Sequence, residues 1–284
     1  SGDGGPTWDL PIAMDVQVIY YDRTLFDEAG IPYPSPEWSW DDLLTYGTQL
    51  ATGTGPDKRY GFLSNWLPMD IYLYLEAHNV HLVQQQNGKI VYNFDSDAVK
   101  RAVQWWVDLD RRYGVLPPLM SEPGARDYEL LRARRVAMWS DWAGNRGATW
   151  LYTPDSQLGV LPIPRGEITV ANINVWYILI SARTREREAC WRWVRYLSDH
   201  LPPGHLAPVR TSQLNSAEFR QQVGDDMANA YLSALEADSR LALDKWPGPF
   251  LMWLQEALDE IAGGADVGAA LGKAQQKADR FAGQ

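Results

Sequence analysis

The alternation of apolar and polar positions near the start of the chain predicts a strand. Residues 10–21 read LPIAMDVQVIYY, and β-branched or aromatic side chains recur at nearly every second position. Such a strand buries one face more than the other. The next segment, residues 22–30, predicts a short helix that ends at Gly30, because prolines at positions 32, 34 and 36 prevent its continuation.

Capping residues and apolar periodicity predict further helices. Ser39 is a suitable N-cap for a helix over residues 40–50, with two aspartates in the first turn where the helix dipole favours acids. A longer helix is expected over residues 99–113, in which apolar side chains recur with helical spacing. A helix is also expected over residues 266–281, in which apolar side chains recur at alternating spacings of four and three.

The stretch over residues 136–150, VAMWSDWAGNRGATW, concentrates aromatic and polar side chains. The apolar run Val136–Trp139 predicts a buried strand that stops at Ser140, which leaves Trp142 at its carboxyl end. The small residues at positions 143–145 let a ligand approach the backbone and are suited to open a helix. In open α/β sheets ligands gather at this edge.

Trp142 is a candidate for stacking against a sugar. Its flat ring stands beside Asp141, Asn145 and Arg146, and a sugar presents an apolar face together with hydroxyls that need donors and acceptors. Packing in the core is the expectation for Trp139 and Trp150.

Composition narrows the possible function. With 284 residues and 45% hydrophobic content, the chain can bury a large core in one or two domains. A formal net charge of −10 argues against nucleic acid and anionic membrane partners. The single cysteine, Cys190, excludes an internal disulfide and is expected to be a buried thiol. The four histidines lack zinc spacing, so we expect neither a metal nor a cofactor.

The early part of the chain resembles a known family. The segments Tyr20-Tyr21-Asp22-Arg23, Leu25-Phe26, Ala29-Gly30-Ile31 and Trp38-Ser39-Trp40 follow one another as in the extracellular solute-binding proteins of ABC sugar importers, the family of maltose-binding protein. The resemblance continues over nearly the whole chain. It implies an α/β fold of the type II periplasmic-binding-protein kind, truncated at its N-terminus.

The resemblance also implies a division of the chain. Residues 1–7 are expected to be an artificial or processed start, residues 8–17 form a hinge strand, and residues 18–165 form the C-terminal lobe. Residues 166–224 return across the hinge and form part of the N-terminal lobe, whereas the helices in residues 225–284 pack on the C-terminal lobe. Because one wall of the cleft is then missing, a second polypeptide or self-association is expected to supply it.

Ten residues are implied as ligand-binding. They are Trp66, Asp70, Asp141, Trp142, Asn145, Arg146, Asn174, Trp176, Trp246 and Trp253. Asp70 is expected to accept a hydroxyl hydrogen bond one helical turn after Trp66. Ordinary packing is the alternative for Trp176 and Trp253.

The function that the resemblance implies is that of a binding protein and not an enzyme. It would bind an oligosaccharide in the interlobe cleft and pass it to the membrane permease of an ABC transporter, in the periplasm or from a lipid anchor on the cell surface. Two alternatives remain. Asp141 with Asp70 or Asp15 could form the carboxylate pair of a glycosidase, or the chain could be an interaction module without a transport role.

Overall fold

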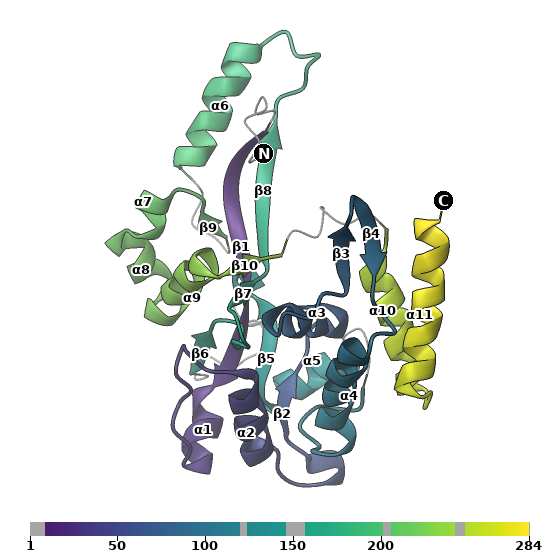
Figure 1. The fold of residues 1–284 in the computed structure, drawn as a ribbon. Helices are drawn as coiled ribbons and strands as arrows, with labels where there is room; N and C mark the ends of the chain where they lie inside the picture. Colours follow the sequence, from purple (N-terminus) through teal and green to yellow (C-terminus); the bar gives the residue numbers. More distant parts are fainter. Residues whose placement is uncertain (1–8, 120–123, 146–156, 201–205, 242–247, 284) are drawn as a thin grey trace.

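A single long strand, β1 (Asp9–Asp22), runs through the centre of the molecule and connects its lower and upper parts (Figure 1). The computed structural model describes residues 9–119, 124–145, 157–200, 206–241 and 248–283. The strand expected over residues 10–21 is confirmed, and β1 is slightly longer at each end.

The lower half of β1 belongs to a sheet in the order β2-β5-β1-β6. The strands β5 (Val136–Trp142) and β6 (Leu158–Leu161) flank β1 and run antiparallel to it. The strand β2 (Tyr60–Leu63) runs parallel to β5. The expected stop of β5 at Ser140 is wrong, because β1 continues to offer ladder partners, with Gln17 opposite Trp142.

The upper half of β1 pairs with two other strands. The strand β8 (Ile173–Leu179) runs antiparallel to residues 9–16, and Asp15 lies opposite Asn174. The short strand β9 (Ala207–Pro208) pairs with β1 at Ala13 and Met14. The strands β1 and β8, which both run between the lower and the upper part of the molecule, therefore lie side by side. The division of the chain into lobes at residues 17, 165 and 224 stays a prediction.

Alternating side chains of β1 enter two separate cores. Ile19 and Tyr21 pack in one core, whereas Val18 and Tyr20 pack in the other. The first core is completed by α1 (Arg23–Ala29), α2 (Trp40–Leu50), α3 (Leu67–Ala77), α4 (Asp97–Arg111), α10 (Phe250–Ala262) and α11 (Val267–Ala282). The second is completed by α5 (Ala125–Arg132), α7 (Thr211–Leu214), α8 (Ala217–Val223) and α9 (Asp225–Glu236).

Local signals place the first helices as expected. Helix α1 ends at Gly30, whose φ of 66° is the left-handed conformation that glycine adopts without strain. Helix α2 starts after Ser39, which forms a reciprocal capping box with Asp42. The remaining short elements are η1 (Gly55–Asp57), the hairpin of β3 (Val83–Gln86) and β4 (Lys89–Tyr92), and the parallel pair of β7 (Val170–Ala171) and β10 (Ser239–Arg240).

Several tryptophans belong to the cores. Trp139 is 1% exposed and its ring stacks on Tyr20 with centroids 5.8 Å apart, which confirms the packing expected for it. The other buried ones are Trp38, Trp40, Trp106 and Trp253. Trp150 lies outside the described residues. These tryptophans therefore serve packing, so the fourteen tryptophans of the sequence do not by themselves indicate sugar binding.

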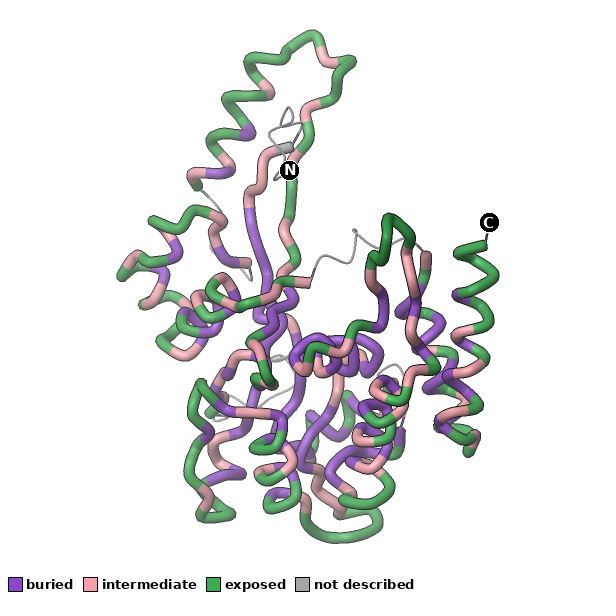
Figure 2. The backbone as a smooth tube through the Cα atoms, in the orientation of Figure 1, coloured by how far each residue is buried: buried purple, intermediate pink, exposed green. Residues whose placement is uncertain are grey.

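The upper part, formed by β8 and α6 (Arg187–Asp199), is mostly exposed (Figure 2). On α6, Val194 is buried, whereas Trp193 is 60% exposed and Tyr196 is 51% exposed. Cys190 is only half-buried, so the expectation of a buried thiol is wrong. The cause is that α6 packs mainly against β1, so little else covers its outer side chains in the described residues.

Candidate functional site

The loops that follow β2 and β5 carry two of the expected aromatic residues to the same edge of the sheet. Leu63 lies opposite Trp139 in the parallel pairing, and Trp66 and Trp142 each follow three residues later. The carboxyl ends of adjacent parallel strands lie at one edge, so both residues come to that edge. Both side chains are half-buried.

Asn65 and Ser140 connect these two loops. The backbone N–H of Asn65 donates to Ser140 Oγ at 2.9 Å, and its side-chain Nδ2 donates to Asp141 Oδ1 at 3.2 Å. Because Trp66 directly follows Asn65 and Trp142 directly follows Asp141, these bonds hold the two loop segments that carry the tryptophans next to each other.

Asp70 lies beneath these loops with 1% exposure. Its Oδ1 accepts from Gln17 Nε2 at 2.5 Å, and its Oδ2 accepts from Ser64 Oγ at 2.5 Å and Ser140 Oγ at 2.6 Å. Burial raises the pKa of Asp70 to about 6, although these three hydrogen bonds lower it. Both oxygens accept from protein donors, so Asp70 joins β1, β5 and the residue that follows β2, and its contact with a ligand hydroxyl stays a prediction.

Asp141 lies closer to the ring of Trp142 and is 7% exposed. Its Oδ1 accepts from Asn145 Nδ2 at 2.8 Å and from the backbone N–H of Trp142 at 2.8 Å. Burial raises the pKa of Asp141 to about 6, partly offset by these two bonds. Among the described residues, Oδ2 of Asp141 accepts no hydrogen bond, and this oxygen is the one available to a ligand hydroxyl.

A third carboxylate, Asp15, completes the cluster from β1. It accepts from the backbone N–H groups of Val16 and Gly144, each at 2.9 Å, and from the Tyr231 hydroxyl at 3.4 Å. Burial raises its pKa, and its charge adds to the raised pKa of Asp141. The acids considered for a glycosidase thus lie in one cluster, but hydrogen bonds from the protein hold each of them.

Gln17 connects this cluster of acids to Asn172, the residue that directly precedes β8. While its Nε2 donates to Asp70, its Oε1 accepts from Asn172 Nδ2 at 2.9 Å. The sequence interpretation missed Gln17, Ser64, Ser140, Asn172 and Tyr231. The polar positions 15 and 17 inside an otherwise apolar strand were the one signal, because a buried polar side chain needs partners.

The remaining expected site residues are spread more widely. Asn174 and Trp176 lie on β8 opposite Asp15 and Ala13, and Trp176 is 52% exposed. Trp253 is 9% exposed and makes edge contacts with Tyr92, Phe94 and Phe281, which is the packing alternative. Arg146 and Trp246 lie outside the described residues.

Metal-binding clusters and membrane-spanning helices are both missing from the described residues. No group of three or more His, Cys, Asp or Glu side chains there has the geometry to hold a metal ion. No helix in the same residues combines the length and the apolar character needed to cross a membrane.

The model of the family described as "Bacterial extracellular solute-binding protein" matches residues 2–200. The chain belongs to this family. A curated relative from Brucella abortus (strain 2308), described as a candidate binding protein, is 31% identical over 70 residues. That match spans 25% of this chain and 16% of the relative.

Solved structures share the fold. Maltose-bound MalE3 of T. maritima superposes with a TM-score of 0.76 at 17% identity, over 98% of this chain and 73% of that one. Lmo0181 from Listeria monocytogenes, in complex with cycloalternan, gives 0.77 at 15% identity, over 99% and 73%. UgpB from Mycobacterium tuberculosis, in complex with glycerophosphocholine, gives 0.73 at 16% identity, over 96% and 70%.

These comparisons confirm the expected fold class and family. The fold is the α/β type II periplasmic-binding-protein fold, and this chain spans about 73% of the T. maritima and L. monocytogenes chains. The family consists of binding proteins, in agreement with the expected non-enzymatic role, and its description places it outside the cytoplasm. Membership of this family argues against the glycosidase alternative.

Proposed function

We propose that the protein containing this chain binds an oligosaccharide at the edge formed by β2 and β5 and passes it unchanged to the permease of an ABC transporter. The observation that carries the proposal is the register of Trp66 and Trp142, three residues beyond the paired Leu63 and Trp139. Two half-buried rings at one edge suit the apolar faces of successive sugar units.

The polar groups between the rings support a carbohydrate over a purely apolar solute. Asp141 offers a carboxylate oxygen, and hydrogen bonds to a charged acceptor are stronger than neutral ones. Asn65 and Asn145 hold Asp141 from either side, so the acceptor is preorganised before a ligand arrives. Asp70 contributes indirectly, because it holds Ser64 and Ser140 in the two loops.

The upper part would supply further contacts. Asn174 and Trp176 lie on β8 across the strand pair from Asp15, and the exposed Trp176 ring is a third aromatic surface. Three such surfaces exceed what a monosaccharide needs. The neighbours that carry maltose and cycloalternan in their solved structures agree with a carbohydrate ligand, but their low identity leaves the sugar open.

The exposed apolar side chains of the upper part are proposed to be covered by another polypeptide segment or a second copy. They include Tyr177, Leu179, Trp191, Trp193 and Tyr196, each at least 49% exposed. Apolar surface gathered in this way commonly marks an interface. An interaction module without a transport role predicts the same association but no sugar binding. Light scattering that finds a monomer, together with no binding of an apolar dye, would contradict the proposed cover.

Location follows from the family. An extracellular solute-binding protein meets its permease outside the cytoplasm, and we propose either the periplasm or a lipid anchor at the cell surface.

A calorimetric screen tests the proposed ligand. Maltose, longer malto-oligosaccharides, cyclic oligosaccharides, a free monosaccharide and glycerophosphocholine are titrated into this chain and into the full-length protein. The proposal expects an oligosaccharide to bind more tightly than its monosaccharide unit and to be recovered intact by chromatography. Hydrolysis of the sugar, or a response to glycerophosphocholine alone, would overturn it.

A further inference from the structure

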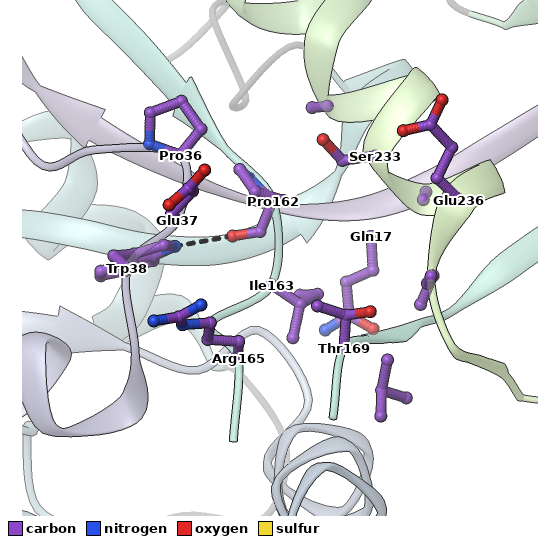
Figure 3. Close-up of a pocket in the computed structure, with 15 residues that line it drawn as sticks. Gln17, Pro36, Glu37, Trp38, Pro162, Ile163, Arg165, Thr169, Ser233 and Glu236 are labelled. Carbon is purple, nitrogen blue, oxygen red and sulfur yellow. Dashed lines mark hydrogen bonds between the residues drawn. The ribbon is translucent and has the colours of Figure 1, made fainter. Parts of the chain in front are cut away.

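A cavity of about 370 Å³ lies apart from the two tryptophan loops, between α9, the segment before α2 and the crossing segment near residue 170 (Figure 3). This volume falls within the range of about 300–1,000 Å³ found for small-molecule sites. None of the described ligand-binding residues expected from the sequence lines it.

Small residues create this hollow. Helix α9 contributes Ala230 and Ala234, one turn apart on the same helical face, and Ala237 follows just beyond its end. Across the cavity stands the indole of Trp38, which is held in place because its Nε1 donates to the Pro162 carbonyl at 2.9 Å. The alanines and the fixed Trp38 indole therefore form an apolar part of the wall, and polar side chains form the rest.

Two polar side chains of the lining already have hydrogen-bond partners. Gln17 Nε2 donates to Asp70 and Gln17 Oε1 accepts from Asn172. The Thr169 hydroxyl donates to Asp238 at 2.8 Å. A charged or polar ligand would therefore have to be bound by other side chains that line the cavity.

Three charged side chains lie around the opening: Arg165, Glu37 and Glu236. Within the described parts of the chain, none of the three has a side-chain hydrogen bond or ion pair. Arg165 is anchored by its backbone, whose N–H donates to Trp38 and whose carbonyl accepts from Trp40. Glu37 and Glu236 stand on opposite sides of the hollow in Figure 3.

We propose that this cavity binds a small zwitterion with an aliphatic body. A carboxylate of the ligand would pair with Arg165, in the two-bond geometry that guanidinium groups favour. An ammonium would pair with Glu37 or Glu236, and the aliphatic part would pack against the alanines and Trp38. An anion alone would face two unpaired acids, and a cation alone would leave Arg165 without a partner. An aliphatic α-amino acid combines all three parts.

L-leucine is the probe that tests the charge pattern, by calorimetry on the intact chain. Two analogues are matched to it: 3-methylbutylamine lacks the carboxylate, and 4-methylpentanoate lacks the ammonium. Leucine should bind and each analogue should bind about tenfold more weakly or worse, since each loses one charge-assisted contact. An absence of leucine binding, or equal binding of either analogue, would overturn the proposal.

Two variants locate the binding to this cavity. Arg165→Gln should weaken leucine binding by about tenfold or more, whereas Arg101→Gln, an exposed arginine of α4, should leave it unchanged. Ala234→Leu should fill the hollow and abolish binding, with a thermal melt to verify that the variant is folded. Unchanged leucine affinity in both Arg165→Gln and folded Ala234→Leu would place the probe elsewhere. The result of the leucine test does not depend on carbohydrate binding, which is proposed to use other residues.

Discussion

The side-chain amide of Gln17 donates to the carboxylate of Asp70 at 2.5 Å, although 53 positions separate them in the chain. This bond ties the strand that connects the two parts to the first turn of α3, directly below the loops of Trp66 and Trp142. Asp70 therefore has a positioning role, and its removal should affect stability first and ligand affinity through the loops.

Asp70→Ala should destabilise the fold by about 2–4 kcal/mol, because it leaves Gln17, Ser64 and Ser140 without their shared acceptor. Chemical denaturation measures the change in the free energy of unfolding. Asp57→Ala is a matched control, since Asp57 is exposed on η1 and should change the value by less than about 0.5 kcal/mol. Equal effects of the two substitutions would show that the buried network contributes nothing.

The stability of the protein should fall between about pH 4 and pH 6 as the pH rises. Burial raises the pKa of both Asp70 and Asp141 to about 6, above an unfolded value near 3.8. In this window the folded state holds more protons than the unfolded state, so raising the pH favours unfolding. Each group accounts for on the order of 1–3 kcal/mol.

Urea denaturation at pH 4 and pH 6.5 checks this sign. The contribution of these two acids makes the wild type lose stability over the interval, and Asp70→Asn should lose less because one titrating group is gone. Carboxylates elsewhere with lowered pKa, such as Asp238, act in the opposite direction. The comparison between wild type and variant is therefore the decisive quantity, and an equal pH dependence in both would contradict the role of Asp70.

Local sequence signals were sufficient for the elements that depend on neighbouring residues. Gly30 ends α1 and Ser39 starts α2 because capping involves only a few adjacent backbone groups. The strand β1 was visible because its side chains alternate. These elements, in their order, also carried the resemblance that gave the fold class.

The arrangement of the site depended on contacts that local patterns do not contain. Asp15, Asp70 and Asp141 meet only because β1, α3 and β5 pack together, and nothing near Asp70 in the sequence indicates that Gln17, Ser64 and Ser140 surround it. Cys190 was expected to be buried, yet on α6 it is only half-buried, because burial depends on what packs against a helix. Helical period alone could not distinguish the two outcomes.

Trp253 should prove to be a packing residue. Its indole lies among Tyr92, Phe94 and Phe281, so Trp253→Ala should cost about 3–5 kcal/mol of stability. Trp253→Phe should cost less, since it keeps an aromatic ring in the cluster. Thermal unfolding of the two variants measures this order. A Trp253→Ala variant that melts like the wild type but binds sugar poorly would instead restore the ligand role expected from the sequence.

Trp142→Ala should reduce oligosaccharide affinity by about tenfold or more while the fold is retained. The ring is half-buried at the carboxyl end of β5, with Asp141 and Asn145 beside it. Stacking of a nucleic-acid base on an aromatic ring is worth about 1–3 kcal/mol, and a sugar ring that gains similarly would lose that amount in the variant. Tyr113→Ala is the control, because Tyr113 is 37% exposed beyond the end of α4 and lies near the start of β2, where Gly61 donates to the Val115 carbonyl, away from the two loops. Calorimetry with the best sugar from the screen gives both affinities, and circular dichroism verifies the fold. If Trp142→Ala binds as tightly as the wild type, the edge formed by β2 and β5 is not the binding surface.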